Sequence, residues 1–168
     1  MLVSTGIMLC LVLLAGAAIV YREVGIPFVG MQEEKAIGLY VGASPFDLKP
    51  SKSERAILTA EDIHDVDAEY VTDPFVVERD GEWYMFLGVR KESDGRGAIG
   101  LAESSNGRSW EYQGIVLEEE FHTSFPHVVE SHGEYYMIPE SEGSGAIRLY
   151  RATRFPTKWK PEAELLSG

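Results

Sequence analysis

Cysteine is almost absent from this chain: the one residue, Cys10, lies in an apolar stretch at the N-terminus. A single thiol excludes an intrachain disulfide and any zinc site built on several cysteines. The four histidines, which are His64, His122, His127 and His132, do not pair at the spacing of a helical zinc motif. The acidic segment 61–69 lacks the spacing and central glycine of a calcium loop, and the acidic run 118–120 is expected to be a solvated loop and not a metal site. The sequence therefore predicts no metal site and no cofactor.

Basic residues are also scarce. The chain carries 15 Lys and Arg against 27 Asp and Glu, for a formal net charge of −12. Binding to nucleic acid needs clustered Lys and Arg opposite the phosphates, and no such cluster is present. The composition therefore predicts no nucleic-acid partner and disfavours anionic lipid headgroups.

Charge of either sign is missing from the first 20 residues, where Met1 to Val20 is just long enough to cross a bilayer as a helix. Tyr21 and Arg22 then supply an aromatic and a basic flank. We expect an N-terminal apolar helix within residues 1–22 that anchors the protein in a membrane through residues 2–20.

Two alternatives to an anchor remain open. Residues 15–17 (Ala-Gly-Ala) fit a signal cleavage site, which would make the protein secreted, although no basic residue precedes the apolar core. In the second alternative, the start of the chain is mispredicted, or the chain is a fragment whose apolar end packs against another part of the protein. Arg22 and Lys35 follow it, which weakly favours a cytoplasmic C-terminal part and leaves the side of the membrane undecided.

The most informative feature is an internal repeat. Pro74–Met85 aligns without a gap with Pro126–Met137, 52 residues further along. Ala98–Leu101 aligns with Ala146–Leu149 after a contraction of four residues, and Ala36–Tyr40 resembles the same portion. So many matches in one order indicate that the chain repeats a structural unit of about fifty residues.

Each unit predicts four short antiparallel strands. Asp80-Gly81 lies between two runs rich in β-branched and aromatic residues, and His132-Gly133 occupies the same place in the second unit. Four strands in about fifty residues are typical of a β-propeller blade. The sequence predicts an all-β fold over residues 35–168: a partial propeller of the five-bladed type, with complete blades at about 73–117 and 125–166 and part of a third at about 35–60. Because a propeller needs at least four blades, we expect open blade faces and self-association through them.

Several motifs resemble one known family. They are Ile37-Gly38-Leu39-Tyr40, Ser44-Pro45-Phe46, Val71-Thr72-Asp73-Pro74-Phe75, Glu82-Trp83-Tyr84-Met85-Phe86, Phe125-Pro126-His127-Val128, Glu134-Tyr135-Tyr136-Met137-Ile138-Pro139-Glu140-Ser141 and Arg148-Leu149-Tyr150-Arg151-Ala152. Together they resemble the N-terminal domain of the glucosamine inositolphosphorylceramide transferase family, over about the first half of such a domain. That domain is similar in fold to the five-bladed propellers of glycoside hydrolase families 43 and 32.

The resemblance implies a carbohydrate-associated module. In that family the glycosyl transfer is attributed to a separate C-terminal domain, so catalysis by this part is not implied. Hydrolases of the family-43 type place a base at the start of an innermost strand, in an Asp-Pro setting similar to that of Asp73. Asp73 is thus a candidate base. Its alternative is a turn residue that caps backbone amides ahead of Pro74.

Three further residues are site candidates. Glu140 aligns with Gly88 and breaks the repeat, which makes it a candidate pocket carboxylate or a residue needed by a local loop. His122 and His127 flank the start of the second inner strand and are candidates to bind sugar hydroxyls, although a hydrogen-bonded structural role is favoured for both. Phe125 stands where the first unit has Asp73, so the repeat supplies no second acid there.

Two functional hypotheses follow. The first is a carbohydrate-associated propeller module, without catalysis in this chain, from a membrane-linked glycosyl-transfer protein, with a carbohydrate or glycoconjugate as ligand. The second is a truncated glycoside hydrolase or transglycosylase of the family-43 type that uses Asp73 as its base. Glycoside hydrolysis needs two carboxyl groups, and the absence of a second one at Phe125 favours the first hypothesis.

Overall fold

The computed structural model describes residues 35–51 and 56–168. The apolar segment predicted as a helical anchor, residues 1–22, lies outside the described residues. Within the described ranges, no helix has both the length and the apolar character needed to cross a membrane.

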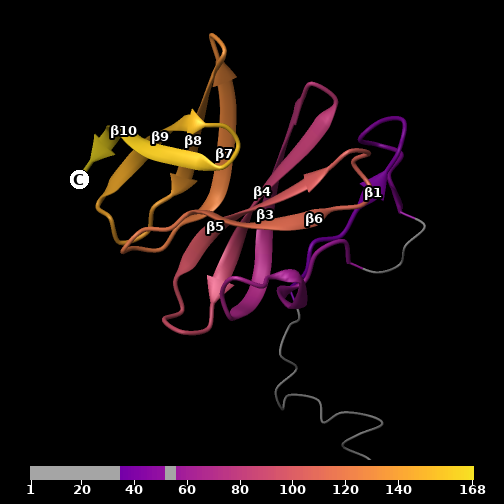
Figure 1. The fold of residues 1–168 in the computed structure, drawn as a ribbon, viewed down its shortest axis with the longest axis horizontal. Coiled ribbons are helices and arrows are strands. Elements are labelled where there is room, and N and C mark those ends of the chain that lie inside the picture. The colour runs from indigo at the N-terminus through magenta and orange to yellow at the C-terminus, as the bar shows by residue number, and fades with distance from the viewer. Residues whose placement is uncertain (1–34, 52–55) are drawn as a thin grey trace, which may run out of the picture. The chain divides into compact units, whose positions relative to one another are not determined.

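The fold is all-β, as the sequence predicts, and its main elements are two four-stranded antiparallel sheets (Figure 1). The first sheet follows chain order, with β3 (Ala68–Arg79), β4 (Glu82–Lys91), β5 (Gly97–Ser104) and β6 (Glu111–Leu117). The second contains β7 (Ser124–Ser131), β8 (Glu134–Glu140), β9 (Ala146–Arg154) and β10 (Lys158–Ser167), also paired in chain order. Each repeat in the sequence thus forms one up-and-down sheet of four strands.

The first hairpin of each sheet has the turn that its sequence predicts. Asp80 and Gly81 have φ values of 55° and 85°, and His132 and Gly133 have 53° and 81°. Positive φ at both central residues defines the type I′ turn, whose twist matches that of the flanking strands. Asp followed by Gly is well suited to it, because both residues tolerate this backbone conformation.

A smaller element precedes the first sheet. It contains the short strands β1 (Tyr40–Val41) and β2 (Lys49–Pro50), which pair with each other, and the 3₁₀ turn η1 (Ala60–Asp62). An isolated bridge joins Ile37 to Leu58. Both residues are buried in an apolar cluster with Val71, Met85 and Tyr112 of the first sheet. This segment therefore covers one face of the first sheet.

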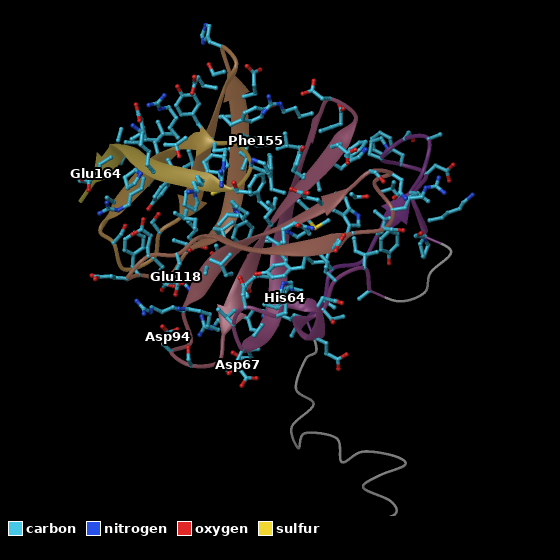
Figure 2. All side chains as sticks on the ribbon, viewed as in Figure 1. His64, Asp67, Asp94, Glu118, Phe155 and Glu164 are labelled. Atoms are coloured by element: carbon cyan, nitrogen blue, oxygen red, sulfur yellow. The ribbon has the colours of Figure 1, made fainter. Side chains whose placement is uncertain are left out.

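A second apolar cluster joins the two sheets. Phe86 and Leu101 of the first sheet pack in it with Val128, Met137 and Tyr150 of the second. The ring of Trp159, on β10, meets that of Phe86 edge-on at a centroid distance of 5.5 Å. Phe155, labelled in Figure 2, stacks on Tyr135 at 3.8 Å and also contacts Tyr84 of the first sheet. The two sheets therefore bury apolar surface against each other, which accounts for the nearly continuous apolar runs in their strands.

Candidate functional site

The first strand of each sheet, β3 or β7, is kinked at an equivalent residue. In β3 the pairing register shifts between Thr72 and Phe75, and in β7 it shifts between Ser124 and His127. The residues inside these bulges, Asp73 and Phe125, have φ values of 52° and 45°, and each precedes a proline. Residues held in this region cost about 1–3 kcal/mol each and cluster at binding sites. A bulge also redirects the side chain that it carries.

The strand β3 is longer than the sequence predicts, because it continues through the kink at Asp73. The first strand was expected to begin at Asp73, but β3 begins at Ala68 and continues through the bulge. Its additional portion pairs Tyr70 with Arg90 and Thr72 with Gly88 of β4. Asp73 therefore lies within a paired strand and not at its start, and the strand brings further polar side chains to the same end of the sheet.

A pocket of about 230 Å³ opens beside this kink. Asp73 lines it from β3, and His122 lines it from the segment that leads into β7. Thr72, which also lines the pocket, donates a hydrogen bond of 3.0 Å from Oγ1 to Asp73 Oδ1. Tyr70 and Ser124 complete its polar wall. Two of the four residues singled out in the sequence thus meet at one pocket.

The protonation of His122 follows from its contacts. The amide of Gly97 donates a hydrogen bond of 2.8 Å to His122 Nδ1, so Nδ1 is the acceptor and the neutral ring carries its proton on Nε2. The neighbouring Thr123 donates to the carbonyl of Gly97 from its amide at 3.1 Å and from Oγ1 at 3.2 Å. His122 is therefore held in place through one ring nitrogen and offers the other as a donor.

Ionic contacts tie down the segment that carries His122. Lys91, whose side chain is only 7% exposed, contacts Glu118 at 2.5 Å and Asp94 at 3.2 Å, and Figure 2 labels both carboxylates. The hydrogen bond from Lys91 raises the pKa of its ammonium group, and the hydrogen bonds from Arg96 lower the pKa of Asp94. Arg96 also donates to the backbone carbonyl of Glu120. The loop after β4 thereby fixes residues 118–123.

Two cationic side chains border the same pocket. Lys35 Nζ lies 4.5 Å from the ring centroid of Tyr70, in a cation–π contact. Arg90 Nε lies 3.9 Å from Glu69 Oε2, and it is buried without a hydrogen-bond partner among the described residues. Within those residues, no group of three or more His, Cys, Asp or Glu side chains is placed to hold a metal ion. The pocket therefore offers hydrogen-bonding groups and side chains of both charge signs.

Glu140 lines a neighbouring pocket. It ends β8 and accepts a hydrogen bond of 2.6 Å from Ser124 Oγ at its Oε2. This second pocket has a volume of about 500 Å³ and shares Phe125 with the first. Asp73 likewise stands between the first pocket and a third, of about 450 Å³, lined by the segment Lys35–Gly38. The two kinked residues, Asp73 and Phe125, thus each form a wall between adjacent pockets.

His127 is not brought to any of these three pockets. Its ring packs edge-on against Phe75, its counterpart in the first repeat, with 4.9 Å between the ring centroids. Phe75 lies on β3 and His127 on β7, and these two strands contact each other. His127 therefore packs against the first sheet and does not line a pocket wall among these three.

Sequence reasoning did not predict Tyr70, Thr72 or Arg90 as site residues, and it considered Phe125 only as the repeat position that lacks a second acid. Tyr70 and Thr72 alternate along the portion of β3 that was not recognised as strand, and Arg90 is the cross-strand partner of Tyr70. Phe125 could have been recognised from the sequence, because it precedes a proline and takes the place that Asp73 has in the first repeat.

The fold is similar to propeller-like structures of glycosidases. Native arabinanase Arb43A of Bacillus subtilis aligns with a TM-score of 0.56 and 17% identity, over 82% of this chain and 50% of that one. The β-fructofuranosidase BmSUC1 of Bombyx mori aligns with a TM-score of 0.52 and 15% identity, over 70% of this chain and 28% of that one. At these identities the likeness concerns the fold alone.

The sequence comparisons identify the family. Glucosamine inositolphosphorylceramide transferase 1 of Arabidopsis thaliana is 34% identical over 147 residues, which cover 78% of this chain and 19% of that protein. The protein of the same name from Oryza sativa subsp. indica is also 34% identical, with 20% of its length covered. The chain thus spans about a fifth of the curated relatives that it matches. The family model described as "Glucosamine inositolphosphorylceramide transferase 1, N-terminal" matches residues 31–167, and this chain belongs to that family.

Proposed function

We propose that this chain recognises a carbohydrate or glycoconjugate through the pocket between Asp73 and His122, and that it performs no catalysis by itself. The observation that carries the proposal is the convergence of complementary polar groups on one pocket. The Asp73 carboxylate accepts hydrogen bonds, and the Nε2–H of the neutral His122 ring donates one. Neighbouring sugar hydroxyls each donate and accept, so they match such a pair.

The proposed architecture is a partial β-propeller of the five-bladed type. Its support is the pair of four-stranded sheets packed through one apolar cluster and the likeness to propeller-like structures. Under this proposal the sheets are consecutive blades, and the kinks at Asp73 and Phe125 lie at the inner ends next to the axis. The segment 35–60 then belongs to a third blade. Because the relatives are named as transferases, we propose that the module is part of a glycosyl-transfer protein.

The positions of the carboxylates support the proposed absence of catalysis. Glycoside hydrolysis uses two carboxyl groups that flank the bond to be cleaved. Among the described residues that line the first pocket, Asp73 carries the carboxylate, whereas Glu140 lines the second pocket and is engaged by Ser124. The pocket therefore has an arrangement for binding and not for the paired chemistry.

A matched pair of variants tests the recognition. Asp73→Asn and Asp80→Asn each remove one carboxylate at a backbone position of almost equal φ, 52° and 55°. Asn tolerates this conformation, so neither change should unfold the protein. We expect Asp73→Asn to lower affinity for saccharides on a glycan array and in calorimetry, and Asp80→Asn to leave it unchanged. Equal affinities for both variants and the native chain would refute the proposed site.

The alternative function, a glycosidase or transglycosylase with Asp73 as its base, is favoured by the place of Asp73 in a pocket of a glycosidase-like fold. It is tested by assaying the chain on aryl glycosides, including arabinosides and fructosides. Our proposal expects no turnover. Turnover that disappears in Asp73→Asn would replace it with the alternative.

We also propose a membrane tether through residues 2–20, which hold no charged side chain. The test is flotation of the full chain with phosphatidylcholine vesicles, with Leu11→Arg/Leu14→Arg as the control. Flotation of the native chain alone is expected. Equal flotation of the native chain and the arginine variant would argue against the tether and favour the secreted alternative. Cleavage near residues 15–17 in a secretory host would support that alternative.

Self-association is proposed for the second sheet. Val129 and Leu166 of that sheet are 37% and 66% exposed, so apolar surface remains open there. Light scattering of the full chain in detergent is expected to give a mass above that of one chain per micelle, and Leu166→Lys is expected to reduce it. One chain per micelle would contradict the proposal.

A further inference from the structure

Phe125 occupies a position that folding alone does not favour. Its side chain is 63% exposed, and its φ of 45° lies in the left-handed region that bulky residues avoid. The following proline restricts its backbone further. An exposed Asn or Gly would adopt the same kink with less strain and without presenting an apolar ring to water. The ring therefore has little to contribute to folding at this place.

The same ring lines two neighbouring pockets. Phe125 lines both the pocket of about 230 Å³ that holds Asp73 and the pocket of about 500 Å³ that holds Glu140. A hydrogen bond of 2.6 Å from Ser124, in the wall of the first, to Glu140, in the wall of the second, also links them. The first pocket alone is smaller than the roughly 300–1,000 Å³ usual for ligand pockets. A ligand of ordinary size would extend beyond the first pocket, and Phe125 stands at one of the two sides where an adjacent pocket begins.

The second pocket has the composition expected for a sugar ring. Ile138 and Ile147 supply apolar surface, while Glu140 and Ser141 supply acceptors and a hydroxyl. Ser124 donates a hydrogen bond to Glu140 Oε2. The second oxygen of the same carboxylate can accept a hydrogen bond from a ligand hydroxyl. A pyranose or furanose ring presents C–H groups on its faces and hydroxyls at its rim, so it matches an aromatic wall with polar groups around it.

We infer that the ligand contains at least two linked sugar rings, one in each pocket, with Phe125 as the aromatic platform at the junction. The inference rests on the proposed carbohydrate recognition and specifies the size of what is recognised. The first ring contacts Asp73 and His122. The second ring contacts Glu140 and lies against Phe125, so the residue that breaks the repeat contributes to binding beyond the first ring.

The experiment compares matched saccharides on the full chain, purified in a detergent without a sugar headgroup. The probes are the methyl glycosides of glucose, galactose, mannose and arabinose, each as a monosaccharide and as its homodisaccharide, titrated by calorimetry. For the sugar that binds, we expect the disaccharide to bind at least about tenfold more tightly, which is about 1.4 kcal/mol. Equal affinity for the two forms would overturn the inference and leave the proposed function standing. Failure of every saccharide to bind would overturn both.

Two variants separate binding from folding. Phe125→Asn removes the ring and suits the left-handed backbone, so we expect an unchanged or higher Tm together with loss of the tenfold preference for the disaccharide. Phe125→Tyr keeps an aromatic face and is expected to retain the preference. A lower Tm in Phe125→Asn, with both saccharides weakened equally, would show that Phe125 serves the fold and would overturn the inference.

Discussion

The amide of Gly97 donates a hydrogen bond of 2.8 Å to Nδ1 of His122, 25 residues further along the chain. This contact joins the first residue of β5 to the segment that leads into the second sheet. It decides which ring nitrogen of His122 can donate a hydrogen bond, because an acceptor nitrogen in a neutral imidazole leaves the other as the donor. The packing at Gly97 therefore matters for the pocket as well as for the fold.

Replacement of Gly97 by alanine should disturb this contact. An added Cβ would lie 2.4 Å from the carbonyl oxygen of Thr123 and 2.7 Å from Cε1 of His122, so the segment must move. We expect Gly97→Ala to lower the free energy of unfolding by about 1–3 kcal/mol, as overpacked sites do, measured by urea denaturation. Gly38→Ala is the control, since nothing lies within 4 Å of its added Cβ. A loss in Gly97→Ala no greater than in Gly38→Ala would contradict this reading of the contact.

The packing of the two sheets on each other is tested at Phe86. This side chain is fully buried in the cluster that joins the sheets, and its ring contacts Trp159 on β10 and Phe155 in the turn between β9 and β10. Phe86→Ala should lower the free energy of unfolding by about 3–5 kcal/mol. Phe46→Ala removes the same ring from a position that is 98% exposed, and it should change stability by less than about 0.5 kcal/mol. Similar thermal unfolding of the two variants would exclude a shared core between the sheets.

A row of carboxylates on the first sheet gives a pH-dependent prediction. Burial, then the charges of Glu82 and Glu111, raises the pKa of Glu103, which pairs directly with Glu111 across β5 and β6. A raised pKa in the folded state means that the stabilising contribution is complete below the unfolded pKa, about 4.3, and is lost as the pH rises through the folded pKa.

Glu103→Gln should therefore stabilise the protein at pH 7 by roughly 0.2–1 kcal/mol, the range for cross-strand pairs. The gain should disappear at pH 4 or below, where the native carboxyl group is protonated. Urea unfolding at several pH values measures both, with Glu92→Gln as a control outside this row. A gain that is constant with pH would show that repulsion between the carboxylates is not its cause.

The repeat made much of the fold predictable. Alternating runs of β-branched and aromatic residues around Asp80-Gly81 and His132-Gly133 predicted the hairpins, because local turn chemistry and strand propensity agree there. These features depend on residues close in sequence or on the period of the repeat.

The site was less accessible to sequence reasoning because it depends on contacts between distant residues. Asp73 and His122 share a pocket only because β3 and the segment before β7 come together. His127 was grouped with His122 for being near in sequence, but strand alternation and the bulge direct it to Phe75 instead. Neither the continuation of β3 back to Ala68 nor the shared wall at Phe125 follows from a local pattern.

Saccharide binding between Asp73 and His122 can be located directly by NMR. In ¹H–¹⁵N spectra of the full chain titrated with the best-binding saccharide, we expect the largest chemical-shift changes at the amides of Thr72, Gly97 and Ser124, which line that pocket. The amides of Ser104, Ser105 and Glu111, which line a pocket at another part of the first sheet, should not move. Chemical-shift changes confined to that other pocket, or no changes at high concentrations of every saccharide tested, would show that saccharides do not bind between Asp73 and His122.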